Sequence, residues 1–165
     1  MMDNNSLEQL IKKHHKDAFL WACQCCYYDQ EEGKEVLQQT YVKIVEGKAR
    51  FTERSTIKTW LFSVIRFTAI DHMKKKKQFT TLEKIPQIMD SSDDWEASSV
   101  DYKKLLMSLP ERQQQVLLLS FYHEMTLAQI AEVTQLHIGT VRTHYERGKA
   151  TLKQLILNKR KLNYG

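Results

Sequence analysis

Apolar residues recur every three or four positions through most of this sequence, which is the period of α-helices that bury one face. The first stripe begins after Ser6, and Ser6 and Gln9 have the spacing of a capping box. The pattern therefore predicts a helix, or a pair of helices, that starts at Ser6. Its expected core positions are Leu7, Ile11, Ala18, Trp21, Ala22 and Cys25.

A second helix is expected between Gly33 and Gly47, and Gly47 stands where a left-handed residue commonly ends a helix. Its apolar positions are Leu37, Tyr41, Ile44 and Val45. The opposite, mainly polar face holds Glu35, Gln38, Gln39, Val42 and Glu46. Such a face is ordinarily in solvent, and it is also a candidate surface for a protein partner. The residues alone do not decide between these interpretations.

A third, long helix is expected to begin near Ser55 or Thr56 and to end in four lysines, Lys74–Lys77. Its predicted buried positions are Ile57, Trp60, Leu61, Val64, Ile65, Thr68 and Met73. Phe62 and Phe67 lie off this stripe. The lysines suit the negative end of a helix dipole, and they equally suit phosphate groups.

The helical pattern stops near residue 79. Residues 79–107 contain Pro86, several serines and, from Ile85 to Tyr102, five acidic residues with no basic one. This composition predicts a flexible acidic linker with at most short helical pieces. A few apolar residues there are unusual for a tether and are candidates for docking elsewhere: Ile85, Ile88, Met89 and Trp95.

Helical signals resume at residue 108, where Ser108 and Glu111 have capping-box spacing and Pro110 suits a first turn. The apolar run VLLLSFY then predicts a buried helix, and residues 126–156 have the pattern of a helix-turn-helix. Thr126 is the expected cap of its first helix. The expected inner side consists of Ile130, Ala131, Leu136, Ile138 and Val141. The chain is therefore predicted to be all-α, with small helical domains at residues 1–78 and 108–165 joined by the linker at 79–107.

The second helix of this motif carries side chains on its outer face that can reach base edges and phosphates in a major groove. They are Thr140, Arg142, Thr143, His144, Arg147 and Lys149. The alternative is a helical hairpin with a solvated basic face. Two residues depart from the usual motif, since Gln135 stands where glycine is common and His137 where a serine cap is expected. We expect either departure to cost about 1 kcal/mol.

Charge divides the chain in the same way as helical periodicity. The net charge is +5, with basic residues in excess in both predicted domains and acidic residues in excess in the linker. This distribution indicates a protein that contacts a polyanion through two surfaces. No apolar run approaches the length of a membrane span and the N-terminus lacks the features of a secretory signal, so we expect a cytoplasmic protein without membrane insertion.

The three cysteines, Cys23, Cys25 and Cys26, fall within four residues and are followed by no second ligand pair. They cannot alone supply the four ligands of a structural zinc site. We interpret them as buried reduced thiols, with redox sensing as the alternative. The sequence predicts no metal site and no cofactor.

Three segments in this order resemble bacterial RNA polymerase sigma factors of the extracytoplasmic function (ECF) group in the sigma-70 family. VLQQTYVKI resembles the region 2.2 helix that docks on the polymerase clamp, and TWLFSVIRFTAIDHMKKKK resembles regions 2.3 and 2.4. LPERQQQVLLLSFYHEMTLAQIAEVTQLHIGTVRTHYERGKATL resembles region 4. The resemblance covers nearly the whole chain. It implies a protein that binds core RNA polymerase at the clamp and flap, directs transcription initiation at promoter DNA and is commonly held by an anti-sigma factor.

The resemblance also assigns roles to residues. The minus-35 duplex would be read by the six outer residues of the helix-turn-helix, Thr140 to Lys149. The core-polymerase contacts would be Glu35, Gln38 and Gln39. Opening of the minus-10 element exposes bases to aromatic rings and phosphates to cations, and stacking is worth roughly 1 to 3 kcal/mol per base. The residues with this chemistry are Arg50, Phe51, Arg54, Lys58, Phe62, Arg66, Phe67 and Lys74, whereas Trp60 is expected in the core.

This sequence departs from the family pattern at several of these positions. Lys34 and Glu35 stand where an acidic pair is usual, and Gln38 and Gln39 where a Gln-Glu pair is usual. Phe67 replaces a common Asn, and Lys74–Lys77 replace residues that are often arginines. These changes put polymerase affinity and minus-10 sequence reading in question, since lysine contacts phosphate without bidentate base recognition.

Two other classes of protein compete with this interpretation. A stand-alone helix-turn-helix regulator would need a receiver or ligand-binding domain with strands, and residues 1–78 show no strand pattern. A nuclease could use Asp71 and His72, or His14 and His15. Adjacent residues on a helix point about 100° apart, however, which is a poor start for joint catalysis. We interpret His14 and His15 as packing or boundary residues and predict no enzymatic activity.

Overall fold

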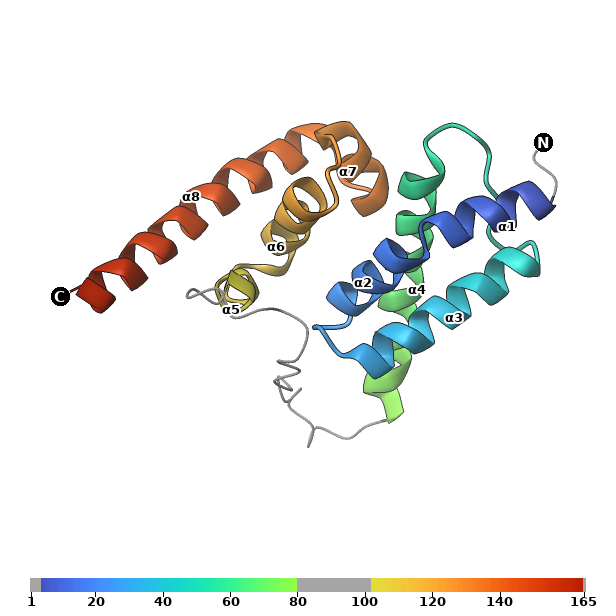
Figure 1. Ribbon diagram of the computed structural model, residues 1–165, viewed down its shortest axis with the longest axis horizontal. Helices are drawn as coiled ribbons and strands as arrows, with labels where there is room; N and C mark the ends of the chain where they lie inside the picture. Colours follow the sequence, from blue (N-terminus) through green and yellow to red (C-terminus); the bar gives the residue numbers. More distant parts are fainter. Residues whose placement is uncertain (1–3, 80–101, 165) are drawn as a thin grey trace. The chain divides into compact units, whose positions relative to one another are not determined.

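The computed structural model describes residues 4–79 and 102–164 and divides the chain into two compact units (Figure 1). Within those ranges every regular element is helical, as predicted. The first unit holds α1–α4. The second holds α5, α6, the π-helical turn η1, most of α7, and α8. Most of the predicted linker, with Ile85, Ile88, Met89 and Trp95, lies outside the described residues.

The first predicted helix is a pair, α1 (Asn4–Lys13) and α2 (His15–Cys25). The chain breaks at His14, whose φ and ψ are −100° and 8°, so this histidine is a boundary residue. His15 Nδ1 is hydrogen-bonded to the Tyr41 hydroxyl at 2.8 Å. The predicted cap at Ser6 is wrong, because the helix already runs through this residue.

Helix α3 (Gln30–Val45) begins earlier than its pattern predicted, because Asp29 caps it. The Asp29 carboxylate accepts hydrogen bonds from the backbone amides of Glu31 at 3.0 Å and Glu32 at 3.2 Å. Gly33 therefore lies inside the helix and not at its start. Its absent side chain lets α2 approach, since a Cβ there would lie 2.5 Å from Cys23 Sγ. At the other end Gly47 has φ +75°, which confirms its predicted role.

Helix α4 (Ile57–Phe79) follows a cap at Thr56, whose hydroxyl accepts from the Thr59 amide at 3.2 Å. It packs against both α2 and α3. The core is centred on Trp21 and Phe62, whose fully buried rings stack with centroids 5.7 Å apart. The Trp21 indole N–H also donates to the Phe62 carbonyl at 3.1 Å. Burying two such side chains contributes roughly 2 to 3 kcal/mol each.

The second unit begins with α5 (Tyr102–Met107), α6 (Glu111–Leu117) and η1 (Leu118–Tyr122). The predicted capping box at Ser108 is wrong, because its hydroxyl instead donates to the Leu105 carbonyl at 2.6 Å. The apolar run is buried from Val116 to Leu119 but ends in exposed rings, since Phe121 is 59% exposed. Helix α6 packs on α8, where a Cβ on Gly148 would lie 3.1 Å from Leu117 Cδ1.

Helices α7 (Leu127–Thr134) and α8 (Ile138–Tyr164) form the predicted helix-turn-helix. Thr126 and Gln129 make a complete capping box, which confirms Thr126 as the cap. Gln135 ends α7 in the left-handed region at φ 58°. Ile130 and Val141 are fully buried, as predicted, but Ile138 at the first position of α8 is 39% exposed and was wrongly placed inside.

Candidate functional site

One face of α3 carries the residues that the sequence assigned to a protein partner. Glu35 and Gln38 are exposed, Gln39 is half-buried and Val42 is 53% exposed. At about 100° per residue these four positions fall within one third of the helix circumference. The buried side is formed by Val36, Leu37 and Thr40. Val45, predicted to be buried, is 86% exposed at the last position of the helix, so this surface is more apolar than the sequence pattern indicated.

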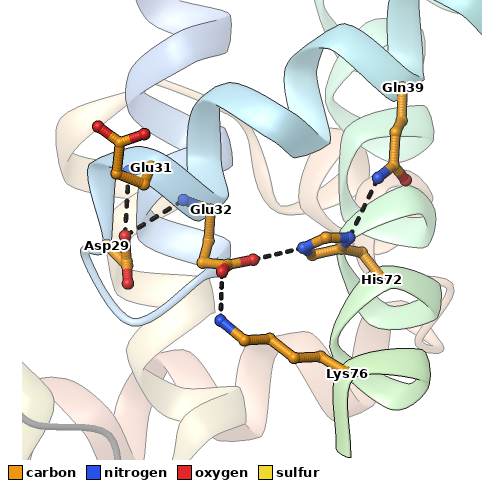
Figure 2. A network of polar contacts seen from close by, with 6 residues as sticks. All are labelled: Asp29, Glu31, Glu32, Gln39, His72 and Lys76. Atoms are coloured by element: carbon orange, nitrogen blue, oxygen red, sulfur yellow. Dashed lines mark hydrogen bonds and ion pairs between the residues drawn. The ribbon is translucent and has the colours of Figure 1, made fainter. Parts of the chain in front are cut away.

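Beneath this face, polar side chains join α3 to α4 (Figure 2). The Gln39 amide nitrogen lies 3.1 Å from His72 Nδ1, and His72 Nε2 is hydrogen-bonded to a Glu32 carboxylate oxygen. The other Glu32 oxygen accepts from the Lys76 ammonium. We call this chain of contacts, from Gln39 through His72 and Glu32 to Lys76, the α3–α4 network. Of the four lysines Lys74–Lys77, Lys76 is therefore directed toward α3 by its contact with Glu32.

Hydrogen bonds and charges within the α3–α4 network shift the pKa values of Glu32 and Lys76. Burial alone would raise the pKa of Glu32, but hydrogen bonds from Lys76 and His72 outweigh it and hold this pKa below its ordinary value. The hydrogen bond to Glu32 raises the pKa of Lys76. Glu32 is therefore an anion and Lys76 a cation at neutral pH, so they form an ion pair that fastens α3 to α4.

Glu32, Glu35 and His72 each place a potential metal-ligand atom within 4.8 Å of the others. A metal ion there would have to compete with Lys76, which already supplies a positive charge to the Glu32 carboxylate. The residues present therefore fit an ion pair between helices better than a cation site.

The exposed side of α4 carries part of the surface expected to meet DNA. Phe67 is 51% exposed and Lys74 is exposed, and their spacing of seven residues puts them on one side of the helix. Ile70, between them, is 36% exposed and was not recognised from the sequence. Its signal was the i, i+3 spacing from Phe67. Together Phe67, Ile70 and Lys74 form what we call the α4 stripe.

Two residues of the expected minus-10 set do not belong to this surface. Phe62 is fully buried against Trp21, and Arg66 is only 9% exposed. Both lie on the inner side of α4. The buried side of this helix is wider than the stripe of apolar positions that the sequence predicted. The sequence assignment of Phe62 and Arg66 to DNA contact is therefore corrected: they build the core that supports the α4 stripe.

The remaining members of that set lie near the start of α4. Phe51 packs on Trp60 with ring centroids 5.3 Å apart, and Trp60 is half-buried and not a full core residue as expected. Lys58 places its ammonium 5.7 Å from the Phe62 ring centroid. Arg50 and Arg54 are exposed in the segment before α4, and Arg50 Nε donates to the Gly47 carbonyl at 3.3 Å.

The six residues of α8 that were predicted to read DNA differ in their exposure and in their position around the helix. Thr140, Thr143 and Arg147 are exposed and fall within about 60° of one another around the helix. Arg142 is also exposed, but it lies about 100° around the helix from Thr143 and farther from the other two. The Thr143 hydroxyl donates to the Gly139 carbonyl at 3.0 Å. Thr140, Thr143 and Arg147 form the outer surface of the helix-turn-helix, which we call the α8 reading face.

His144 lies at the margin of the α8 reading face, and Lys149 lies outside it. His144 is half-buried, and its Nδ1 is a buried atom without a hydrogen-bond partner. The Lys149 ammonium lies 4.2 Å from the Tyr145 ring centroid and 3.6 Å from a Glu146 carboxylate oxygen. Lys149 is nine residues from Thr140 and so lies on the opposite side of the helix.

His137 fills the capping role at the start of α8, where a serine was expected. Its imidazole Nδ1 accepts a hydrogen bond from the Gly139 amide at 3.1 Å. A histidine can thus replace the usual serine at the start of α8. A Cβ at Gly139 would meet only the imidazole, at 3.4 Å or more, so the cap does not require a glycine there. The expected cost at His137 is therefore offset, whereas the left-handed Gln135 retains its cost.

Comparisons with known proteins place both units in one family. Residues 10–79 match Sigma-70 region 2 and residues 99–152 match Sigma-70, region 4, which together cover about three quarters of the chain. RNA polymerase sigma factor YlaC of Bacillus subtilis is 26% identical over 163 residues, covering 93% of this chain and 94% of that protein. The ECF RNA polymerase sigma factor SigW of the same organism is 25% identical over 182 residues, with coverage of 93% and 96%.

Solved structures agree on the fold. The sigma factor RpoE, crystallised with the anti-sigma factor NepR from Bartonella quintana, has a TM-score of 0.73 and 18% identity, covering 92% of this chain and 96% of that one. CnrH in complex with the cytosolic domain of CnrY has a TM-score of 0.62 and 18% identity, with coverage of 93% and 89%.

The helix-turn-helix, the exposed α3 face and these matches define a promoter-directing subunit of bacterial RNA polymerase. The chain belongs to the sigma-70 family and to its ECF group. It binds core RNA polymerase and directs transcription initiation at specific promoters. A stand-alone regulator is not favoured, because region 2 occupies the part of the chain where such a protein would carry a sensing domain. Sigma factors are generally regulatory subunits without enzymatic activity. In the part of the chain that the structure describes, no helix has the length and apolar character of a membrane span.

Proposed function

We propose that the chain divides the work of promoter recognition among three surfaces on two domains, residues 1–78 and 108–165, with residues 79–107 as the acidic linker. The observation that carries this proposal is the α8 reading face, where Thr140, Thr143 and Arg147 are all exposed on one side of the second helix of a helix-turn-helix. Such a helix fits the major groove of duplex DNA. In this proposal it reads the minus-35 element, with His144 at its margin and with Arg142 and Lys149 on another side of α8 as candidates for phosphate contact.

The α3 face meets core polymerase at the clamp. Glu35, Gln38 and Gln39 supply polar contacts, and the exposed Val42 and Val45 supply apolar area beside them. An interface needs both, since apolar burial provides affinity and polar groups fix the register. The α3–α4 network supports this face from below and keeps α3 in place when a partner is bound.

The α4 stripe opens the minus-10 element. Phe67 offers a ring face to a flipped base, and Lys74 offers a charge to the phosphates on the same side of the helix. Arg50, Arg54, Phe51 and Lys58 extend this surface toward the start of α4. Phe62 and Arg66 act indirectly, through the packing that holds the stripe in place.

The assignment as a sigma factor also suggests a protein partner and a cellular location. RpoE was crystallised with an anti-sigma factor, which supports the proposal that an anti-sigma factor also holds this chain. We place its action in the cytoplasm, where polymerase and promoter are found. The chain itself performs no covalent chemistry and needs no cofactor, because nucleotide addition belongs to the polymerase.

Runoff transcription with purified core polymerase and a library of genomic fragments tests this function. The expected result is that the chain selects a small set of fragments sharing two sequence elements. Selection requires both the α8 reading face and the α4 stripe, so Arg147→Ala and Phe67→Ala each lower the yield. Transcripts that are the same with and without the chain would contradict the proposal.

A further inference from the structure

Gln39 reaches from the α3 face to α4, where its amide nitrogen lies 3.1 Å from His72 Nδ1 (Figure 2). The two residues are 33 positions apart in the sequence. His72 makes its second contact through Nε2 with the Glu32 carboxylate, and its side chain is only 13% exposed. The imidazole is therefore held between a residue of the proposed polymerase surface and the half-buried Glu32 carboxylate.

The partners of His72 determine which end of the Gln39 amide faces outward. A carboxylate can only accept hydrogen bonds, so His72 Nε2 must carry the hydrogen in the bond to Glu32. In the neutral ring Nδ1 then carries none and can only accept, so Gln39 must donate through its amide nitrogen. Figure 2 shows the result, with the Gln39 oxygen directed away from His72. With a neutral imidazole, the contact to Glu32 therefore sets the orientation of the Gln39 amide without any need to tell its oxygen from its nitrogen by shape.

We propose that His72 is a positioning residue for polymerase binding, which holds the Gln39 amide with its oxygen outward so that α3 offers an acceptor at this point. The inference rests on the proposed role of Gln39 as a polymerase contact. An unrestrained amide presents either end, because its oxygen and nitrogen have nearly the same shape. When the amide is held with its oxygen outward, only a donor group of the partner can bind it. The amide also loses less conformational freedom on binding, because it is already ordered in the free protein.

The chemistry of the partner group follows. Glu35 lies one turn before Gln39 on the same face and adds a carboxylate to the acceptor oxygen. Glu32 lies beneath, but Lys76 neutralises it. An outward acceptor beside a negative charge suits a basic donor, such as an arginine or lysine of the polymerase surface. A donor amide at the same place would repel such a group.

The affinity of the full chain for core polymerase, measured by biolayer interferometry at neutral pH, tests this inference. His72→Gln reaches the Nε2 position and keeps a donor for Glu32, but it removes the acceptor for Gln39. His72→Asn keeps a polar group at the Nδ1 position and can still accept from Gln39. Gln39→Ala removes the amide itself, and the double variant Gln39→Ala with His72→Gln completes a cycle. Thr68→Val is the matched control, because it breaks the 3.1 Å Lys43–Thr68 link between α3 and α4 without touching Gln39.

We expect Gln39→Ala and His72→Gln each to weaken binding about five-fold, the size of one hydrogen bond. The double variant should bind no more weakly than Gln39→Ala alone, and His72→Asn and Thr68→Val should stay within about two-fold of the parent. Circular dichroism checks that each variant is folded, and His72→Met replaces His72→Gln if that variant is not.

Three results would overturn the inference. His72→Gln could leave affinity unchanged, its effect could persist in full when Gln39 is already alanine, or His72→Asn could weaken binding as much as His72→Gln does. Each would mean that His72 acts only on the fold or not at all. If Gln39→Ala itself binds like the parent, the proposed contact at Gln39 fails, and the inference fails with it for that separate reason.

Discussion

Gly33 of α3 lies so close to Cys23 of α2 that a Cβ at this glycine would be 2.5 Å from the Cys23 sulfur and 2.8 Å from its Cα. These helices can cross here only because one of them has no side chain. Replacing Gly33 with alanine must push the backbones apart, since one of the obstructing atoms is main chain. We expect Gly33→Ala to lower the free energy of unfolding by about 2 kcal/mol.

Urea denaturation followed by circular dichroism measures this change, with Gly139→Ala as the control. A Cβ at Gly139 would meet only the His137 imidazole at 3.4 Å or more, so that substitution should change stability little. Equal effects of the two substitutions would show that helix propensity, and not the α2–α3 crossing, sets the outcome.

The ion pair between Glu32 and Lys76 predicts a dependence of stability on pH. The folded-state pKa of Glu32 is lowered, so its contribution is present above the ordinary value of 4.5 and is lost as pH falls below it. The folded-state pKa of Lys76 is raised, so its contribution is present below 10.5 and is lost as pH rises beyond that. Glu32→Gln should cost about 1 kcal/mol at pH 7, because the lysine side is partly exposed and screened.

Unfolding midpoints in urea at pH 7 and pH 3.5 check this prediction. The difference in stability between the parent and Glu32→Gln should shrink at the lower pH, because this pH lies below the ordinary pKa of 4.5 at which the carboxylate of the unfolded parent is protonated. A gap that stays constant or widens would exclude the ion pair as its source.

The cysteines are expected to differ in reactivity. Burial, with a smaller contribution from the negative charge of Glu32, raises the pKa of Cys26 to about 12, and Cys23 is buried as well. The thiolate is the reactive form, so Cys26 is inert at pH 8. Iodoacetamide should first modify the half-exposed Cys25 and reach Cys23 and Cys26 only on unfolding, as mass spectrometry of digests would reveal. Fast labelling of Cys26 in the folded protein would revive the redox alternative.

Replacing Phe62 with alanine is expected to affect stability, whereas replacing Phe67 is expected to affect promoter opening. Phe62 is fully buried on Trp21, so Phe62→Ala should lower the free energy of unfolding by about 3 to 4 kcal/mol. Phe67 is 51% exposed, so Phe67→Ala should leave stability within about 0.5 kcal/mol but reduce promoter opening. Thermal unfolding and permanganate footprinting of the minus-10 element measure the two effects. A loss of stability in Phe67→Ala comparable with that in Phe62→Ala would contradict the assignment of the α4 stripe.

The period of apolar residues predicted the helices and the helix-turn-helix, because amphipathic helices must bury one face whatever their partners are. It failed where packing between distant segments decides the outcome. Phe62 is inside because Trp21 of α2 covers it, and Gly33 lies within a helix because Cys23 approaches it. Neither pair is visible along the sequence.

The candidate surfaces likewise include features that the sequence predicted and features that only the packing of distant segments determines. Exposed positions such as Gln38, Phe67 and Arg147 could be predicted from helix geometry and residue chemistry. The α3–α4 network could not, since Gln39 and His72 are brought together only by the crossing of α3 and α4. His137 shows a further limit, because its capping bond depends on a side-chain rotamer that residue preferences do not report.

The polymerase surface on α3 and the DNA surface on α8 are predicted to act independently of each other. The most direct test measures two affinities for each of two variants: that of the protein for core polymerase, and that of the reconstituted holoenzyme for promoter DNA. Arg147→Ala should keep the first affinity and reduce the second by roughly ten-fold, with a salt slope smaller by about 0.9. Glu35→Ala with Gln39→Ala should weaken the first, while holoenzyme formed at saturating protein keeps the second. Loss of both affinities in each folded variant would contradict the account.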